Sequence, residues 1–209
     1  MNHLKALLAS SCVVVAGFSA NAATVTIDPV NLVTNYISLG EWNTNGNLES
    51  WSSGQVQNRT VAGGSLNGDV LDTNNDPTLP RNNFAGLGID LDSGNYNVIE
   101  VRIKRTGTAS RFDIFWGTTS ANGISGTRRV DDQGQLPSDG TFHVIQIDMT
   151  GEAAWTSTWD DIRIDPFSGF ATGGRSFEID YVRVGTPVPE PGSFALIGLG
   201  GLCLLRRRR

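Results

Sequence analysis

The chain is 209 residues long, carries a formal net charge of −5 and contains two cysteines and two histidines. Residues 23–187 hold 20 acidic and 11 basic side chains, because Glu190, Lys5 and the four terminal arginines fall outside this range. This acidic balance argues against nucleic acid as a partner, since nucleic-acid binding depends on neutralising phosphates. Cys12 and Cys203 lie near the two ends, so the sequence predicts neither a disulfide nor a thiolate metal site in the body.

The first residues have the pattern of a secretory signal peptide. Met1–Lys5 is a short basic start, Ala6–Phe18 is an uncharged and mostly apolar run, and Ala20–Ala22 fits a small-x-small cleavage site. We therefore predict a signal peptide over residues 1–22, followed by an exported body. A buried N-terminal helix and a lipoprotein site at Cys12 are the alternatives.

The body, residues 23–187, has the pattern of short strands. Alternation is clearest in Val98–Arg105, where the aliphatic side chains share one parity and the charged ones the other. Arg111–Trp116, Phe142–Met149 and Ser176–Val184 follow, with glycine-rich turn signals between them, and Leu66–Asn83 is expected to be a long polar loop. No helical stripe of useful length is present. The sequence predicts one all-β domain, an antiparallel β-sandwich of about eight strands.

Asp180 is the candidate metal ligand that the strand pattern itself suggests. In a regular strand it would share a face with Val182 and Val184. A carboxylate on a partly buried face needs a cation or several hydrogen-bond donors, because removing a charge from water is costly. We expect a structural calcium ion, which prefers oxygen ligands. A salt bridge to a basic side chain such as Arg163 is the alternative.

The tryptophans and acids of the body raise the question of a sugar site or an active site. Exposed tryptophans would support glycan binding, and core packing is the alternative, favoured for Trp116 and also for Trp155, Trp159 and Tyr96. His143 is the one histidine of the body, and no nucleophile motif accompanies it. Neighbouring acids such as Asp131-Asp132 and Asp160-Asp161 face opposite ways on a strand, unlike a glycosidase pair. The sequence predicts no catalytic residues.

The tail, residues 188–209, has three parts in order. Pro189, Glu190 and Pro191 come first, then the uncharged run Phe194–Leu205, and then a basic cluster; the cluster is Arg206, Arg207, Arg208 and Arg209. A helix over the uncharged run would be about 18 Å long, which is short for a membrane span. The arginines would stay on the cytoplasmic side.

This tail resembles the PEP-CTERM sorting signal of Gram-negative bacteria. The resemblance implies recognition of Pro-Glu-Pro by a membrane-embedded exosortase, with the secretion machinery as a further partner. It also implies transient inner-membrane contact through a short C-terminal transmembrane helix, then a place at the cell surface or in an extracellular polysaccharide matrix. An ordinary single-span anchor is the alternative.

The body resembles the galactose-binding-like jelly rolls, which include many carbohydrate-binding modules. The resemblance rests on Glu41–Trp51, on Trp155 followed by Arg163, and on Glu178–Val184 as the last strand. Trp159 and Ser50 depart from the pattern. The resemblance implies a calcium ion that joins the first and last strands, with Glu41 as the partner of Asp180 in the ligand set.

Together these patterns predict an exported, non-catalytic protein with a carbohydrate-binding-like body. Fold alone does not decide function. A purely structural matrix protein with the same fold is therefore the main alternative, and a glycan-active enzyme is the second.

Overall fold

The computed structural model describes residues 23–71, 76–84, 91–92, 94–118, 123–155, 158–169 and 174–186. These residues form eleven strands and no helix. The strands are β1 (Thr24–Ile27), β2 (Thr34–Gly40), β3 (Val56–Ala62), β4 (Ser65–Val70), β5 (Leu79–Arg81), β6 (Val98–Thr106), β7 (Arg111–Thr118), β8 (Arg129–Asp131), β9 (Asp139–Asp148), β10 (Trp159–Ser168) and β11 (Ser176–Thr186). The predicted signal peptide and the sorting tail lie outside the described residues. Within the described part of the chain, no helix has the length and apolar character needed to cross a membrane.

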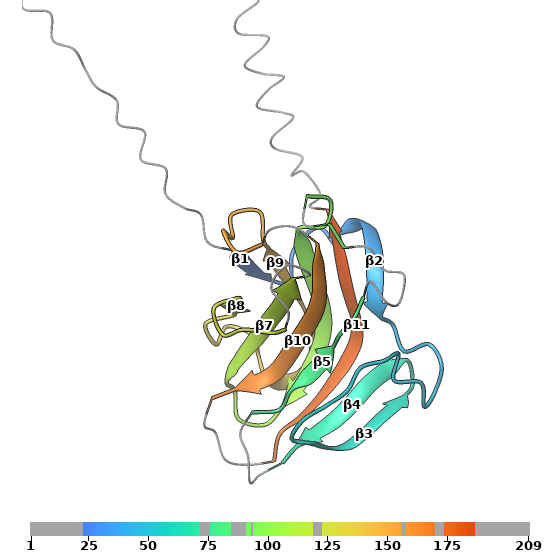
Figure 1. Ribbon diagram of the computed structural model, residues 1–209. Coiled ribbons are helices and arrows are strands. Elements are labelled where there is room, and N and C mark those ends of the chain that lie inside the picture. The colour runs from blue at the N-terminus through green and yellow to red at the C-terminus, as the bar shows by residue number, and fades with distance from the viewer. Residues whose placement is uncertain are drawn as a thin grey trace, which may run out of the picture.

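The strands make two antiparallel sheets, which confirms the predicted all-β sandwich. The larger sheet has the order β1-β9-β6-β11-β4-β3, and β2 also pairs with β11. The smaller sheet has the order β5-β10-β7-β8 and lies in front of the larger one in Figure 1. Strand β11 is the centre of the larger sheet, since it pairs with β6 along one edge and with β4 and then β2 along the other.

The alternation in β6 produces the predicted inner and outer faces. Ile99, Val101 and Ile103 are buried between the sheets, and they pair in register with β9 and β11. The outer face is less uniform than predicted, because Glu100 is fully buried there. The chain between β1 and β2 covers Glu100, and the backbone N–H of Val33 donates a hydrogen bond to its carboxylate.

Strand β11 contains a β-bulge that changes the predicted position of Asp180. Ile179 is opposite Ile103 and Tyr181 is opposite Arg102, so Asp180 is an extra residue in the ladder. The parity changes at this point, and Ile179 and Val182 both face the core. Asp180 therefore does not share the buried face of the valines, contrary to the expectation from a regular strand. It points outward and forms an ion pair with Arg102.

All five tryptophans are buried. They form two groups: the rings of Trp42 and Trp51 lie 6.1 Å apart, and Trp155 lies 5.5 Å from Trp116 and 4.8 Å from Trp159. The prediction of core packing is confirmed for Trp116, Trp155 and Trp159. The largest aromatic side chains of the sandwich therefore pack inside its own core.

The expected loop over Leu66–Asn83 is wrong, because this range contains most of β4 and all of β5. Asn67 and Asp69 point outward, and Gly68 allows Phe177 to approach the strand closely. Gly68 is accommodated in this strand because the ring of Phe177 fills the space that a side chain at this position would need.

Candidate functional site

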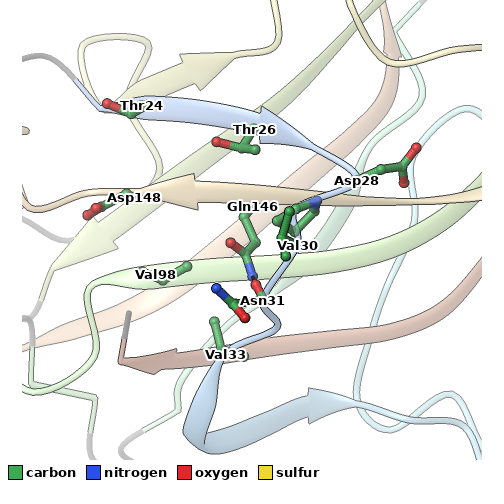
Figure 2. Close-up of a pocket in the computed structure, with 10 residues that line it drawn as sticks. Thr24, Thr26, Asp28, Val30, Asn31, Val33, Val98, Gln146 and Asp148 are labelled. Carbon is green, nitrogen blue, oxygen red and sulfur yellow. Dashed lines mark hydrogen bonds between the residues drawn. The ribbon is translucent and has the colours of Figure 1, made fainter. Parts of the chain in front are cut away.

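A groove of about 400 Å³ lies on the outer face of the larger sheet. It lies over β1, β9 and the start of β6, and one side is formed by the chain that connects β1 to β2 (Figure 2). The groove is lined by Thr24, Thr26, Asp28, Pro29, Val30, Asn31, Val33, Val98, Gln146 and Asp148. We call it the β1 groove. Its lining combines hydroxyl, amide and carboxylate groups with aliphatic side chains.

A buried glutamate fixes the wall of the groove. Glu100 Oε2 accepts hydrogen bonds from the backbone N–H of Val33 at 3.0 Å and from Gln146 Nε2 at 2.7 Å. Gln146 Nε2 also donates to the carbonyl oxygen of Asn31 at 2.8 Å (Figure 2). These bonds hold the connector against the sheet, so the groove is preformed. Glu100 Oε1 is buried without a hydrogen-bond partner. Burial, followed by the charge of Glu100, raises the pKa of Tyr181.

A histidine held between two carboxylates lies beside the end of the groove. His143 Nδ1 is 2.7 Å from Asp28 Oδ2, and Nε2 is 2.9 Å from Thr141 Oγ1 and 3.2 Å from both oxygens of Asp139. The hydrogen bond to Asp28, followed by that to Asp139, raises the pKa of His143. The pKa of Asp28 is lowered, and that of Asp139 falls to about 2, mainly through hydrogen bonds from Thr141.

The row of hydroxyl, imidazole and carboxylate looks superficially like a hydrolase triad, but its electrostatics differ. A general base must be neutral so that it can accept the nucleophile's proton. Two carboxylates favour the charged form of His143, and the Thr141 hydroxyl donates to Asp139 at 2.8 Å. The cluster is therefore suited to tying β1 to β9, and the backbone N–H of Asp28 also donates to the Val144 carbonyl at 2.7 Å.

The two predicted calcium ligands lie in separate ion pairs. Asp180 pairs with Arg102, and Glu41 Oε1 lies 3.1 Å from an Arg183 nitrogen. Among the described residues, no group of three or more His, Cys, Asp or Glu side chains is arranged to hold a metal ion. The alternative of a salt bridge from Asp180 to a basic side chain is found, with Arg102 as the partner; the suggested Arg163 contacts Asp76 and Asp165 instead. Calcium at Asp180 and Glu41 stays a prediction.

Sequence reasoning missed a second cluster, on the outer face of the smaller sheet. Asp113 and Asp165 are both fully buried and lie opposite each other on β7 and β10. Arg129 pairs with Asp113 at 3.0 Å, Arg163 pairs with Asp165 at 2.5 Å, and both guanidinium groups stack on Phe115. No local sequence pattern predicts this cluster, because it depends on the register between strands that are far apart in the chain. Its cations already have carboxylate partners, which indicates a structural role.

Comparison with solved structures finds several carbohydrate-binding domains. The C-terminal family 6 carbohydrate-binding module of LamC, a marine laminarinase from Zobellia galactanivorans, has a TM-score of 0.44 and 17% identity, and the match covers 73% of this chain and 100% of that one. The N-terminal cellulose-binding domain of Cellulomonas fimi β-1,4-glucanase C has a TM-score of 0.46 and 13% identity, covering 73% and 99%. A family 29 carbohydrate-binding module from Piromyces equi has a TM-score of 0.44 and 10% identity, covering 82% and 95%.

No curated protein matches the chain. A family model does match the tail. The family described as the PEP-CTERM protein-sorting motif matches residues 187–209, which include Pro189, Glu190 and Pro191. The chain therefore carries a PEP-CTERM sorting motif at its C-terminus and is similar to exported proteins of the cell surface or extracellular space.

Proposed function

We propose that this protein is an exported, non-catalytic component of the envelope or extracellular polysaccharide matrix of a Gram-negative bacterium, and that its sandwich binds carbohydrate in the β1 groove. The observation that carries the proposal is a preformed polar groove in a chain that also has a sorting motif. The motif supports delivery to a glycan-rich location, and the groove supplies a surface that suits a polyol.

The chemistry of the groove supports a sugar ligand. The hydroxyls of Thr24 and Thr26 donate and accept hydrogen bonds, and the carboxylate of Asp148 accepts them from sugar hydroxyls. Val30, which is 98% exposed, offers aliphatic surface to the C–H groups of a sugar ring. A volume of about 400 Å³ is within the usual range of small-ligand sites.

One observation favours a second candidate, a structural matrix protein without sugar binding. All five tryptophans are buried, so none of them offers an open face on which a sugar could stack. Tyr36, which is 44% exposed, has the Arg183 guanidinium 4.3 Å from its ring centroid. In that case the sandwich has a structural role only, and the sorting tail is the main functional feature.

The proposal includes no enzyme activity. Hydrogen bonds to Asp28 and Asp139 raise the pKa of His143, which disfavours the neutral form that a general base needs. The buried pair Asp113 and Asp165 has no open cleft between its carboxylates, since both side chains are about 1% exposed. These arrangements support binding and structure over glycan hydrolysis.

Sorting is proposed to proceed through an exosortase after export by the secretion machinery, with transient inner-membrane contact through the uncharged run Phe194–Leu205. Replacing Pro189, Glu190 and Pro191 with alanine is expected to leave the protein in the membrane fraction. Fractionation of cells that express both forms would measure this. Equal release of both forms would contradict exosortase processing.

Structural calcium at Asp180 and Glu41 is part of the proposal as a separate hypothesis. It predicts a higher melting temperature with calcium than with a chelator, and Asp180→Ala would remove that difference. Arg102→Ala removes the ion-pair partner of Asp180 and serves as the control for ion-pair loss alone. Identical melting curves of the wild type in calcium and in chelator would rule the site out.

Affinity electrophoresis of the full chain in a mild detergent tests sugar binding. Gels would contain different polysaccharides, including that of the host. The double variant Thr24→Val, Thr26→Val removes two groove hydroxyls but keeps β-branched side chains that suit a strand. Thr60→Val on β3, at the opposite edge of the same sheet, is the matched control.

We expect retardation of the wild type and of the control in at least one gel, and its loss in the double variant. Unchanged mobility of a folded wild type in every gel would favour the structural candidate. Equal retardation of all three proteins would place the sugar site elsewhere on the sandwich.

A further inference from the structure

Large apolar side chains that are exposed occur together in one short stretch. Among the described residues they are Val30, Leu32 and Tyr36, which are 98%, 47% and 44% exposed. We call these three residues the apolar strip. They belong to the connector after β1 and to the start of β2, within the stretch 30–36. Single exposed apolar residues need no explanation, but such a concentration on an otherwise polar domain does.

The apolar strip lies where the chain leaves the sandwich. Thr34, in the middle of this stretch, is opposite Thr186 at the end of β11, and the Thr186 hydroxyl donates to the Thr34 carbonyl at 3.2 Å. Figure 1 shows β2 beside β11, and Thr186 is the last residue of β11. Gly185 also packs against this stretch, since a Cβ there would lie 2.9 Å from Val33. The strip and the exit of the sorting tail therefore share one end of the molecule.

The length of the tail limits how far this end can be from a membrane. Residues 187–193 separate Thr186 from the uncharged run Phe194–Leu205. Fully extended, this spacer reaches at most about 25 Å. When the uncharged run is in the bilayer, the nearest part of the domain is the end that carries the apolar strip. The tether also keeps the strip at a high effective concentration next to the lipid, so a weak contact is sufficient.

We propose that the apolar strip is a membrane-contact surface that rests in the lipid headgroup region while the sorting tail is inserted. This inference rests on the proposed membrane insertion of the tail. A tyrosine with nearby aliphatic side chains suits the interface, where an amphipathic ring has one apolar and one hydrated side. Three side chains are too few for a stable dimer interface, which buries more than about 1,000 Å². Lipid is the occupant that the position of the strip favours.

The contact would seat the domain on the bilayer in a fixed orientation and present the tail to a membrane-bound processing enzyme. Val30 also lines the β1 groove, so the groove would open toward the lipid until the tail is processed. The larger sheet's far end, near Gly107 and Thr108, would point away from the membrane, since Thr106 is opposite Ser176 at the start of β11.

Fluorescence quenching on the full chain tests the proposal. Cys12→Ser and Cys203→Ser remove the native thiols, and Val30→Cys provides one site for an environment-sensitive label. Val30 is 98% exposed, so the change leaves the core intact. Thr108→Cys, exposed at the opposite end of the sheet, is the matched control. The proteins are reconstituted in vesicles of phosphatidylethanolamine and phosphatidylglycerol with and without nitroxide-labelled lipid.

Flotation of the vesicles comes first and separates the two hypotheses. A chain that does not float with the vesicles contradicts the proposed insertion of the tail. For a chain that floats, we expect lipid nitroxides to quench the label at Val30→Cys several-fold more than the label at Thr108→Cys. Leu32→Ser together with Tyr36→Ser is expected to reduce that difference.

Two results would overturn the membrane contact in a chain that floats. Equal quenching at both positions would show that the strip does not approach the lipid. Protection of the Val30→Cys label from aqueous iodide without quenching by lipid would show that protein covers the strip, either the tail itself or a second copy.

Discussion

Asp165 on β10 lies directly opposite Asp113 on β7, and both carboxylates are buried on the outer face of the smaller sheet. Burial raises the pKa of Asp165 to about 7, although its ion pair with Arg163 acts in the opposite direction; Asp76 and Asp113 raise it further. Two buried carboxylates on facing strands are unfavourable when both are charged. The sandwich tolerates them because Arg129 pairs with Asp113 and because Asp165, which lies beside Arg163, keeps its proton up to about pH 7.

The raised pKa of Asp165 predicts a specific pH dependence of stability. The folded state holds this proton up to about pH 7, whereas the unfolded carboxyl loses it near 3.8. The folded state therefore binds more protons between these values, and the contribution of Asp165 to stability falls as pH rises from about 4 to about 7. Asp165→Asn cannot lose a proton, so its free energy of unfolding should improve relative to wild type across this window, by up to about 4 kcal/mol.

Urea denaturation of both proteins over this pH range measures the difference. Asp76→Asn is a useful comparison, because Asp76 contacts the same arginine but is about half exposed, and its loss should lower the pKa of Asp165. A difference between Asp165→Asn and wild type that does not change with pH would contradict the prediction.

His143 is expected to titrate above the ordinary histidine value. Its folded pKa is raised, so its contribution to stability is complete below about pH 6.5 and is lost as pH rises through the folded pKa. NMR titration can separate its signal from that of His3 with a His3→Gln variant. Asp28→Asn should lower the pKa of His143, because Asp28 is the strongest of its partners. An unchanged pKa in this variant would show that the contact is absent in solution.

Arg105 is expected to be among the most sensitive single positions of the sandwich. Its side chain is buried, and its guanidinium donates to the backbone carbonyls of Leu136, Pro137, Ser110 and Pro166. Burial lowers its pKa to about 10, so it remains charged at neutral pH. Arg105→Met keeps much of the packing but leaves these carbonyls without a donor.

We expect Arg105→Met to cost about 3 kcal/mol of unfolding free energy, because buried acceptors would lose their partners. Denaturant midpoints measure the loss. Arg111→Met, at the exposed start of β7, should change stability by less than about 0.5 kcal/mol. A similar small effect at both positions would mean that water replaces the guanidinium.

Gly68 in β4 is predicted to reject any side chain. A Cβ at this position would lie 2.6 Å from Val56 Cγ1 and 2.7 Å from Phe177 Cζ. Gly68→Ala should therefore destabilise the protein by about 1–3 kcal/mol through overpacking. Gly126→Ala is the control, since a Cβ there meets no atom within 4 Å. Equal melting temperatures for the two variants would show that β3 and β11 move apart at little cost.

Four of the longer strands could be predicted from alternation, but β10, which is equally long, and three short strands could not. β6, β7, β9 and β11 contain eight or more residues each, so their period-two pattern is visible without a partner. β1, β5 and β8 contain three or four residues, too few to establish a period. They form because an adjacent strand offers unpaired backbone groups.

The candidate sites divide in the same way. The sorting motif is linear, so its residues could be found in order along the chain. The β1 groove needs Gln146 of β9, Val98 of β6 and the connector at Asn31 in one place, which only the sheet order provides. The position of Asp180 does not follow from the sequence, because continuous alternation through β11 predicts the opposite face for this residue. Ile179 and Val182 can face the same side only when one extra residue lies between them, and alternation alone does not predict such a residue.

The extra residue at Asp180 gives β11 a tolerance for a change of one residue in chain length. Deleting Asp180 would leave Phe-Glu-Ile-Tyr-Val-Arg-Val, a strand in which each apolar core residue keeps its inward position. Deleting Arg102 from β6, whose residues 98–104 pair with β9 without a register shift, would instead move the side chains on one side of the deletion to the opposite face of the sheet. Homologous chains that differ by one residue are therefore expected to carry the difference at Asp180, beside a core that does not change.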